Sequence, residues 1–318
     1  MAATVGVILA VFEVYLLVRW IGGPNFQVVT YGPDEPPTWM KIAVNSAQVL
    51  FPLAAAICFY RFVVLPWRRD RWIPFDGLIL MTAVPLSIWD SLNSYFHTWF
   101  GYNSYFINRG DPLVELPGWQ SFSEPGAQLA WPIFYLPPMY AVVFLGSSAL
   151  GCMVMRRTNA RWPRLPVPAL VGICFVTMVV LDILMEGEGM SRLGFYDETG
   201  TTLPFLEHYY GHDPIRNMVL LALVLTGTSC LRFFRNDRGE SIVERGAHQI
   251  AGLAKTATLR FFAMLAALQI VMIFGFHVPF AITTLISPNA AYHEDMVNNS
   301  YLNDHICGSG TPRECPHG

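Results

Sequence analysis

Acidic side chains inside apolar runs are the first residues in this sequence that could do chemistry. Asp90 follows an uncharged run over residues 77–88 (GLILMTAVPLSI). A carboxylate is costly to bury in lipid. If one α-helix continues through this stretch, polar residues recur at i, i+3, i+4 and i+7 and form a single stripe, which we expect to face protein. The stripe consists of Asp90, Asn93, Ser94 and His97.

A second pair of acids occurs further along the chain. Asp182 and Glu186 are four residues apart at the end of another apolar run, so both project from one face of a helix. Repulsion between them and partial burial favour a proton on one of the two, which is what a general acid requires. The other interpretation is that these are helix-end residues in the headgroup region, paired with Arg192 and Arg216.

These patterns define a candidate site. The expected catalytic residues are Asp90, Asp182, Glu186 and His97. The residues expected to line a substrate pocket are Trp89, Asn93, Tyr95, Tyr102, Asn103, Glu188 and His277. Three roles are open for His97: a base, a proton shuttle or an interfacial residue. His277 can instead bond a backbone carbonyl freed by Pro279, and Glu13, isolated in the first apolar run, is a minor candidate.

Other chemical motifs are weaker or missing. His208 and His212 have the H-x-x-x-H spacing of metal-binding helices, but membrane di-iron enzymes need several such pairs, so we predict no metal and no cofactor. The sequence contains no G-x-S-x-G motif, phosphate loop or dinucleotide fingerprint. Cys307 and Cys315 can form a disulfide in an oxidising compartment, or they can remain two unpaired thiols.

The composition places these residues in a membrane. Of 318 residues, 53% are hydrophobic and 14% are charged, and the mean hydropathy is +0.39, whereas about a quarter of the residues of a soluble domain are charged. We therefore predict an all-α, multi-pass protein of the cell membrane, with the lipid bilayer as a partner. No basic aromatic groove indicates nucleic-acid binding, and no pattern indicates an oligomeric state.

Seven apolar segments are long enough to cross a bilayer. They cover approximately residues 5–21, 42–65, 75–96, 131–155, 167–185, 215–230 and 259–285. Arginines follow the second, fourth and sixth segments, while the loops after the first, third and fifth are acidic. The positive-inside rule then predicts a cytoplasmic amino terminus and an outer carboxy tail. Six spans remain if the first segment lies on the membrane surface.

The loops complete the predicted organisation. Residues 1–286 are expected to form one transmembrane helical domain, and residues 287–318 a polar extracytoplasmic tail. Residues 241–258 are amphipathic and are expected to lie along the membrane interface before the last span. The long polar loop over residues 102–130 has the length of a binding loop or lid.

Several short motifs resemble those of the AveC-like spirocyclases, a family of actinobacterial membrane proteins. The motifs are W-D-S-L-N-S-Y-F (89–96) with F-G-Y-N-S (100–104), D-I-L-M-E-G (182–187), Trp131-Pro132 and the Cys-Pro of the tail. The order and spacing of spans and loops extend the likeness over most of the chain. Residues 89–104 are its specific part.

The resemblance implies spiroketal formation in polyketide biosynthesis, in some members with a dehydration. We therefore expect a cofactor-independent cyclase that acts on a lipophilic, polyketide-type ketone, with buried carboxyls as acid and base. The alternative is a proton-coupled transporter or receptor-like protein in which the same acids form a proton or substrate path. The sequence lacks the paired, interrupted half-repeats of many transporters. A transport assay in vesicles separates the two readings.

Overall fold

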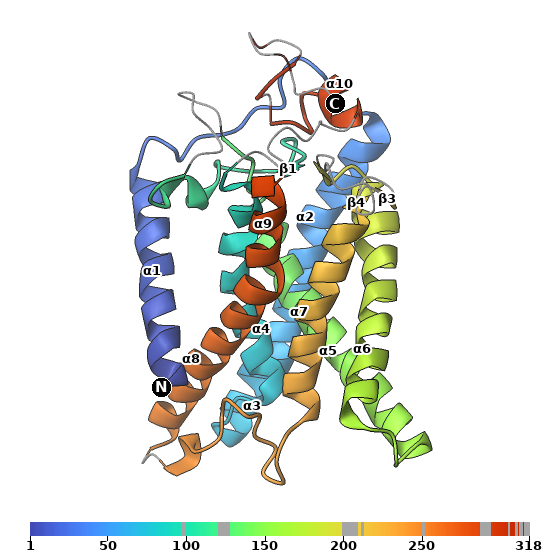
Figure 1. The fold of residues 1–318 in the computed structure, drawn as a ribbon. Coiled ribbons are helices and arrows are strands. Elements are labelled where there is room, and N and C mark those ends of the chain that lie inside the picture. Colours follow the sequence, from blue (N-terminus) through green and yellow to red (C-terminus); the bar gives the residue numbers. More distant parts are fainter. Residues whose placement is uncertain are drawn as a thin grey trace.

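The chain folds into a bundle of long helices with a layer of loops over one end (Figure 1). The computed structural model describes residues 1–96, 100–119, 128–198, 209–210, 213–249, 252–286, 294–304, 306–308, 311 and 314. Seven of the described helices are long and apolar enough to cross a membrane. The predicted all-α membrane architecture is therefore confirmed, and the first span is among the seven.

The first four spans include several changes of helix type. The α-helices are α1 (Ala2–Gly22), α2 (Thr38–Phe59), α3 (Leu65–Asp70), α4 (Phe75–Leu86) and α5 (Leu136–Arg161). A π-helical segment, η1 (Tyr60–Val64), joins α2 to α3, and a 3-10 helix, η2 (Ser87–Ser94), continues α4. A short 3-10 turn, η3 (Pro112–Glu115), lies in the loop that follows.

The last three spans repeat this mixture. The α-helices are α6 (Val167–Asp182), α7 (Ile215–Phe233), α8 (Leu253–Met272), α9 (Val278–Ile286) and α10 (Glu294–Asn298). π-Helical segments extend α6 as η4 (Ile183–Ser191) and join α8 to α9 as η7 (Ile273–His277). A 3-10 turn, η6 (Ala247–Gln249), precedes α8.

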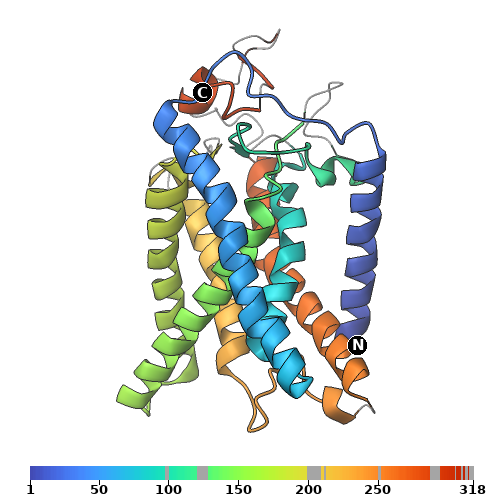
Figure 2. The same ribbon diagram turned by 180° about the vertical axis from the view of Figure 1, so that it is seen from behind.

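Successive spans run in opposite directions, so the connections between them lie alternately at the two ends of the bundle. The amino terminus, α3, the α5–α6 connection and the α7–α8 connection lie at one end, and α10 lies at the other (Figure 1). The arginine-rich connections thus share the amino-terminal end, as the sequence predicted. Figure 2 shows α2 running obliquely across one face of the bundle. The α4–η2 span is the most buried of the seven and α2 is the least.

Two small antiparallel ribbons lie in the loop layer. Strand β1 (Phe100–Tyr102) pairs with β2 (Tyr196–Glu198), and Tyr102 lies directly opposite Tyr196. Strand β3 (Tyr209–Tyr210) pairs with β4 (Asp213–Pro214). The first ribbon joins the loop after the third span to the loop after the fifth, although about 90 residues separate them in the sequence.

The described part of the carboxy-terminal tail packs against the loop layer. The Asp304 carboxylate accepts a hydrogen bond from the Ala130 amide at 3.0 Å, and the Tyr301 carbonyl accepts one from the Ser104 amide at 2.8 Å. Cys307 is buried and disulfide-bonded, in agreement with the predicted oxidation of the tail. Its predicted partner, Cys315, lies outside the described residues.

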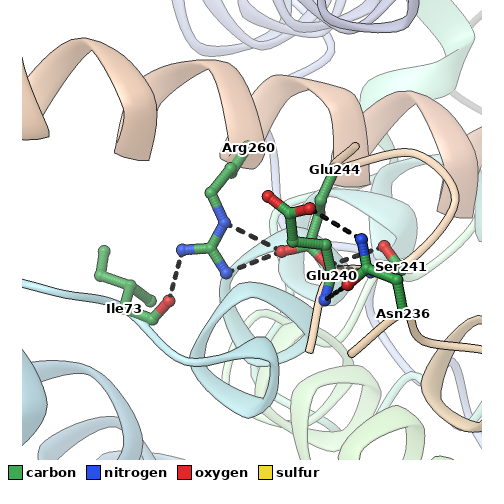
Figure 3. Close-up of polar contacts among 6 residues, drawn as sticks. All are labelled: Ile73, Asn236, Glu240, Ser241, Glu244 and Arg260. Atoms are coloured by element: carbon green, nitrogen blue, oxygen red, sulfur yellow. Dashed lines mark hydrogen bonds and ion pairs between the residues drawn. The ribbon is translucent and has the colours of Figure 1, made fainter. Parts of the chain in front are cut away.

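The connector before α8 forms turns rather than one amphipathic helix. Glu244 is fully buried there, and both Nε and Nη2 of Arg260 donate to its Oε1 at 2.9 and 2.7 Å. The Ser241 hydroxyl donates to the other carboxylate oxygen at 2.6 Å, and Arg260 also donates to the Ile73 carbonyl at 2.8 Å (Figure 3). The buried ion pair fixes the connector to α8, and the bond to Ile73 joins α8 to the segment just before α4.

Candidate functional site

A cavity opens among the spans and is covered by the first ribbon. Its empty space is about 570 Å³, including the part open to the surroundings. The lining residues that carry polar groups are Asp90, Asn93, Tyr102, Tyr140, Glu186, Tyr196, Glu198 and Asn217. The apolar lining residues are Met139, Val143, Phe144, Leu221, Met272 and Phe276. We call this cavity the central pocket.

Asp90 is a buried acid of the central pocket. It is 8% exposed, and its two carboxylate oxygens accept hydrogen bonds from different tyrosines. Tyr102 donates to Oδ2 at 2.6 Å, and Tyr140 donates to Oδ1. Two hydroxyl donors match an ionised carboxylate, which accepts and does not donate. The arrangement suits Asp90 to taking a proton from a bound group.

Tyr102 lies in the loop layer and keeps its proton. Burial raises the pKa of the Tyr102 phenol well above its usual value, and the negative charge of Asp90 beside it raises this pKa further. A neutral phenol is a donor. Tyr102 therefore holds Asp90 by donating to it and does not compete with it as a base.

The 3-10 geometry of η2 determines which residues face the central pocket. A 3-10 helix has 3.0 residues per turn, so side chains at i and i+3 eclipse. Asp90 and Asn93 therefore share a face, and both line the pocket. The stripe expected for a continuous α-helix ends there: Ser94 is buried but is not among the lining residues. His97 lies outside the described residues.

His277 lies behind Asn93. The Nδ1 atom of this fully buried histidine is 2.9 Å from the Asn93 Oδ1 atom, so Nδ1 carries a hydrogen when the ring is neutral. This contact orients the Asn93 amide with its NH2 group away from the ring. His277 thus contacts a pocket residue and does not line the pocket itself.

Glu186 supplies a second carboxyl to the central pocket. It belongs to the π-helical segment η4 and accepts hydrogen bonds from the Asn217 amide at 3.2 Å and the Tyr196 hydroxyl at 3.5 Å. Single π-helical turns inside α-helices are frequent at functional sites. Asp182, one turn earlier, is fully buried but is not among the lining residues. Of the two acids, only Glu186 lines the central pocket.

The first ribbon adds three pocket residues from outside the spans. Tyr196 and Glu198 are two apart in β2 and so lie on the same face, and Tyr102 is the cross-strand partner of Tyr196. The two tyrosine rings meet edge to face with centroids 6.1 Å apart. Glu198 also forms a buried ion pair with Arg216, with Nη2 and Oε2 3.1 Å apart. The ribbon is therefore a polar cover for the central pocket.

The remaining predicted residues lie elsewhere. Trp89 donates to Glu13 at 2.7 Å on a different side of η2 from the pocket, and Tyr95 donates to the Pro117 carbonyl at 2.9 Å. The Asn103 amide donates to the Gly194 carbonyl at 2.8 Å. Glu188 pairs with Arg192 at 2.8 Å, with 41% of the Glu188 side chain exposed. The structure thus brings together Asp90, Asn93, Tyr102 and Glu186 from the predicted set, and leaves these four residues outside the pocket.

Sequence reasoning missed the pocket residues Tyr140, Tyr196, Glu198 and Asn217. An acidic residue in an apolar run stands out because of its cost, but a tyrosine such as Tyr140 is common in helix cores. Tyr196 and Glu198 carry a usable signal, because their two-residue spacing is that of one strand face. That signal becomes informative only once β2 is paired with β1.

The central pocket offers acid/base chemistry at carboxyl groups inside a largely apolar enclosure. These groups are Asp90, Glu186 and Glu198, the last of which is paired with Arg216. Aromatic and aliphatic side chains on several spans can bind a lipophilic molecule, and the polar groups can orient its oxygens. Among the described residues, no group of three or more His, Cys, Asp or Glu side chains is arranged to hold a metal. His208 and His212, the one metal-like pair in the sequence, lie outside the described residues.

Comparisons with known proteins give one match. The model of a family described as "Spirocyclase AveC-like" matches residues 67–301, about three quarters of the chain. This range includes every residue that lines the central pocket. Among curated proteins and among solved structures, no match was found.

Proposed function

Because the chain belongs to the AveC-like spirocyclase family, we propose that it is a membrane-embedded cyclase of polyketide biosynthesis that works in the central pocket. The proposed substrate is a lipophilic ketone that carries two hydroxyl groups. The product is a spiroketal, and in a related reaction a dehydrated ring. The apolar lining over spans that face lipid supports a substrate that partitions into the bilayer.

The reaction needs proton transfers and no external oxidant or reductant. One hydroxyl adds to the carbonyl carbon, its proton leaves and the carbonyl oxygen gains a proton, which gives a hemiketal. Protonation of the hemiketal hydroxyl releases one water and leaves an oxocarbenium ion. The second hydroxyl then adds to this cation and loses its proton. The net change is the loss of one water, and every step is open to general acid/base catalysis.

We assign opposite starting roles to the carboxyl groups of Asp90 and Glu186. Asp90, which accepts two phenol hydrogen bonds, is the base that takes a proton from an attacking hydroxyl. Glu186, with longer contacts to Asn217 and Tyr196, is the acid that protonates the departing hydroxyl. Asn93 and Tyr140 bind oxygens of the substrate. The single observation that carries the proposal is the enclosure of Asp90 by two tyrosine hydroxyls on the pocket wall.

The test is turnover of purified protein in nanodiscs with a panel of synthetic dihydroxyketones, read as loss of one water by mass spectrometry. Asp90→Asn preserves shape but removes the titratable proton, so its turnover per folded molecule should fall by roughly 10² to 10⁴-fold. Glu186→Gln should behave alike, and the double variant should lose little more than the worse single one.

Glu188→Gln is the matched control, because Glu188 is on the same helical segment but is exposed and paired with Arg192. Full turnover by Asp90→Asn would refute the catalytic role. Uptake of a dihydroxyketone into vesicles without any conversion would favour the transporter interpretation instead.

A further inference from the structure

The first span presents a carboxylate to the bundle. The buried residues of α1 are Gly6, Glu13, Leu16 and Trp20, and their spacing of seven, three and four residues makes one stripe along the helix. Most of the rest of α1 is exposed or half-buried, as suits a lipid-facing helix. Glu13 is only 4% exposed within this stripe. A neutral residue would satisfy helix packing at lower cost, so this carboxyl requires an explanation.

Glu13 contacts two other spans through one oxygen. Its Oε1 atom accepts a hydrogen bond from Nε1 of Trp89 in η2 at 2.7 Å, and another from Nε2 of Gln269 in α8. The ring of Phe12, the preceding residue, stacks on Trp89 with centroids 6.0 Å apart. The indole of Trp89 is therefore held both at its polar edge and over its face by consecutive residues of α1.

Trp89 is the residue directly before Asp90. In a 3-10 helix, successive side chains point about 120° apart, because there are three residues per turn. The indole therefore points to α1 while the Asp90 carboxylate points into the central pocket. Rotation of this turn about its axis would move both groups together. Holding the indole fixes the direction in which the carboxylate points.

Further contacts join α1 to the same region. Leu16 packs with Trp89 and with Leu113 of η3 in a small apolar cluster separate from the main core. Arg19 pairs with Glu115 at 3.1 Å. Yet α1 lies entirely before residue 67, where the family match begins. The first span thus lies outside the matched region and packs against the element that bears Asp90.

We propose that Glu13 is a positioning residue: through its hydrogen bond to Trp89, the first span sets the orientation of η2 and of the Asp90 carboxylate. The proposal rests on the proposed function for its catalytic consequence. The structural part of the proposal, that Glu13 orders η2, depends only on the hydrogen bonds and not on the proposed function. The role of α1 is then to complete the site and not only to anchor the chain.

The test compares Glu13→Leu, which removes the acceptor, with Glu13→Gln, which keeps one acceptor oxygen. Val14→Ala is the control, because Val14 is the next residue of α1 and is 58% exposed. The first readout is hydrogen exchange of residues 87–94 in nanodiscs, which needs no substrate. Exchange there should be faster in Glu13→Leu than in the wild type, and unchanged in Glu13→Gln and Val14→Ala.

The second readout is turnover. A reacting group misplaced by about 1 Å can cost roughly 10²-fold in rate, so kcat should fall by about 10- to 100-fold in Glu13→Leu with little change in KM, and Glu13→Gln should restore most of it. Wild-type exchange in Glu13→Leu would overturn the inference, as would faster exchange with unchanged kcat. A wild-type protein without cyclase activity would refute the proposed function, while hydrogen exchange would still decide whether Glu13 orders η2.

Discussion

At the scale of single residues, the two tyrosines around Asp90 determine what this carboxyl can do. A carboxylate with no donors, buried in an apolar pocket, would be neutralised. Tyr102 and Tyr140 come from the loop layer and from α5, respectively, and each donates to one oxygen. The charge of Asp90 is thus stabilised by two elements that meet only in the folded protein.

Removing either hydroxyl should weaken the site. A hydrogen bond to a charged group contributes about 1.5–3 kcal/mol, so we expect Tyr102→Phe and Tyr140→Phe each to lower kcat/KM by roughly 10- to 100-fold. Because both donors serve one carboxylate, the double variant should not lose the product of the two factors. Tyr95→Phe is the control, since the Tyr95 hydroxyl donates to a backbone carbonyl outside the pocket. Wild-type kinetics in both single variants would contradict the arrangement.

Asp111 gives a prediction for pH. This residue of the loop layer is fully buried, and burial raises its pKa from 3.8 to about 7, although hydrogen bonds including that from the Leu113 amide oppose the shift. Between about pH 4 and 7 the folded chain therefore holds a proton that the unfolded chain has released. Stability from this group is present below pH 4 and is lost as the pH rises to 7.

The measurement is the thermal midpoint of wild type and Asp111→Asn in detergent at several pH values. Asparagine keeps an acceptor for Leu113 but cannot ionise, so the midpoint of the variant relative to wild type should rise between pH 4 and 7 and then level off. The free-energy difference should change by at most about 1.4 kcal/mol per pH unit. A constant difference for Asp111→Asn would contradict the prediction.

At the scale of elements, part of the wall of the central pocket is formed where helices change type, while α5 and α7 supply other lining residues. Asp90 and Asn93 lie in the 3-10 segment η2, Glu186 in the π-helical segment η4 and Phe276 in the π-helical segment η7. Such segments rotate the face that a span presents between its two ends. One end of a span can then pack in the core while the other presents polar groups to the cavity.

Removing one partner of the buried ion pair in the connector before α8 should destabilise the protein far more than removing one partner of an exposed pair. Both side chains of the Glu244–Arg260 pair are at most 4% exposed, so Glu244→Leu leaves a buried guanidinium without its partner and should cost about 3–5 kcal/mol. The double variant Glu244→Leu/Arg260→Met should be more stable than the single one. Glu188→Gln, at the exposed pair, should cost about 0.3–0.5 kcal/mol. Thermal unfolding in one detergent compares them, and equal losses at the two pairs would refute the reasoning.

The same changes of helix type limit what could be predicted from the sequence. The seven spans followed from apolar length, Asp90 from the cost of a charge in lipid, and Glu186 from its four-residue spacing to Asp182. The stripe drawn through Ser94 assumed an α-helical period, which η2 does not have. Asp182 was expected beside Glu186, and it is buried but is not among the residues that line the central pocket. The contributions of Tyr196 and Glu198 depend on strand pairing across about 90 residues, which no local pattern encodes.

At the scale of the whole molecule, the arginine-rich connections and the central pocket lie towards opposite ends of the bundle. The arginine-rich connections lie at the amino-terminal end, while the loop layer with its ribbons lies at the other (Figure 1). The central pocket is covered by the first ribbon and so belongs to the half nearer the loop layer. The expected direction in the membrane follows from the arginines.

Reporter fusions test this direction. Fusions after Arg71, Arg164 and Arg238 should report the cytoplasm, and fusions after Asp111, Asp197 and Gly318 the opposite side, because cytoplasmic loops retain arginine. The inverted pattern would reverse the assignment while leaving the alternation of the spans intact. Replacing the arginines at 68, 69 and 71 by glutamine, as a control, should weaken the bias at the first of these loops.

The first ribbon has a consequence for the engineering of substrate range. It delivers Tyr102, Tyr196 and Glu198 to the central pocket from two short loop segments, and neither segment belongs to a membrane-crossing helix. Tyr102 and Glu198 also contact residues of the spans, Asp90 and Arg216 respectively, so these two positions are coupled to the bundle. A substitution at Tyr196 would change the lining of the pocket while keeping both of these contacts. Tyr196 is therefore the ribbon position at which selectivity for the proposed substrate can be altered without redesigning a hydrophobic span.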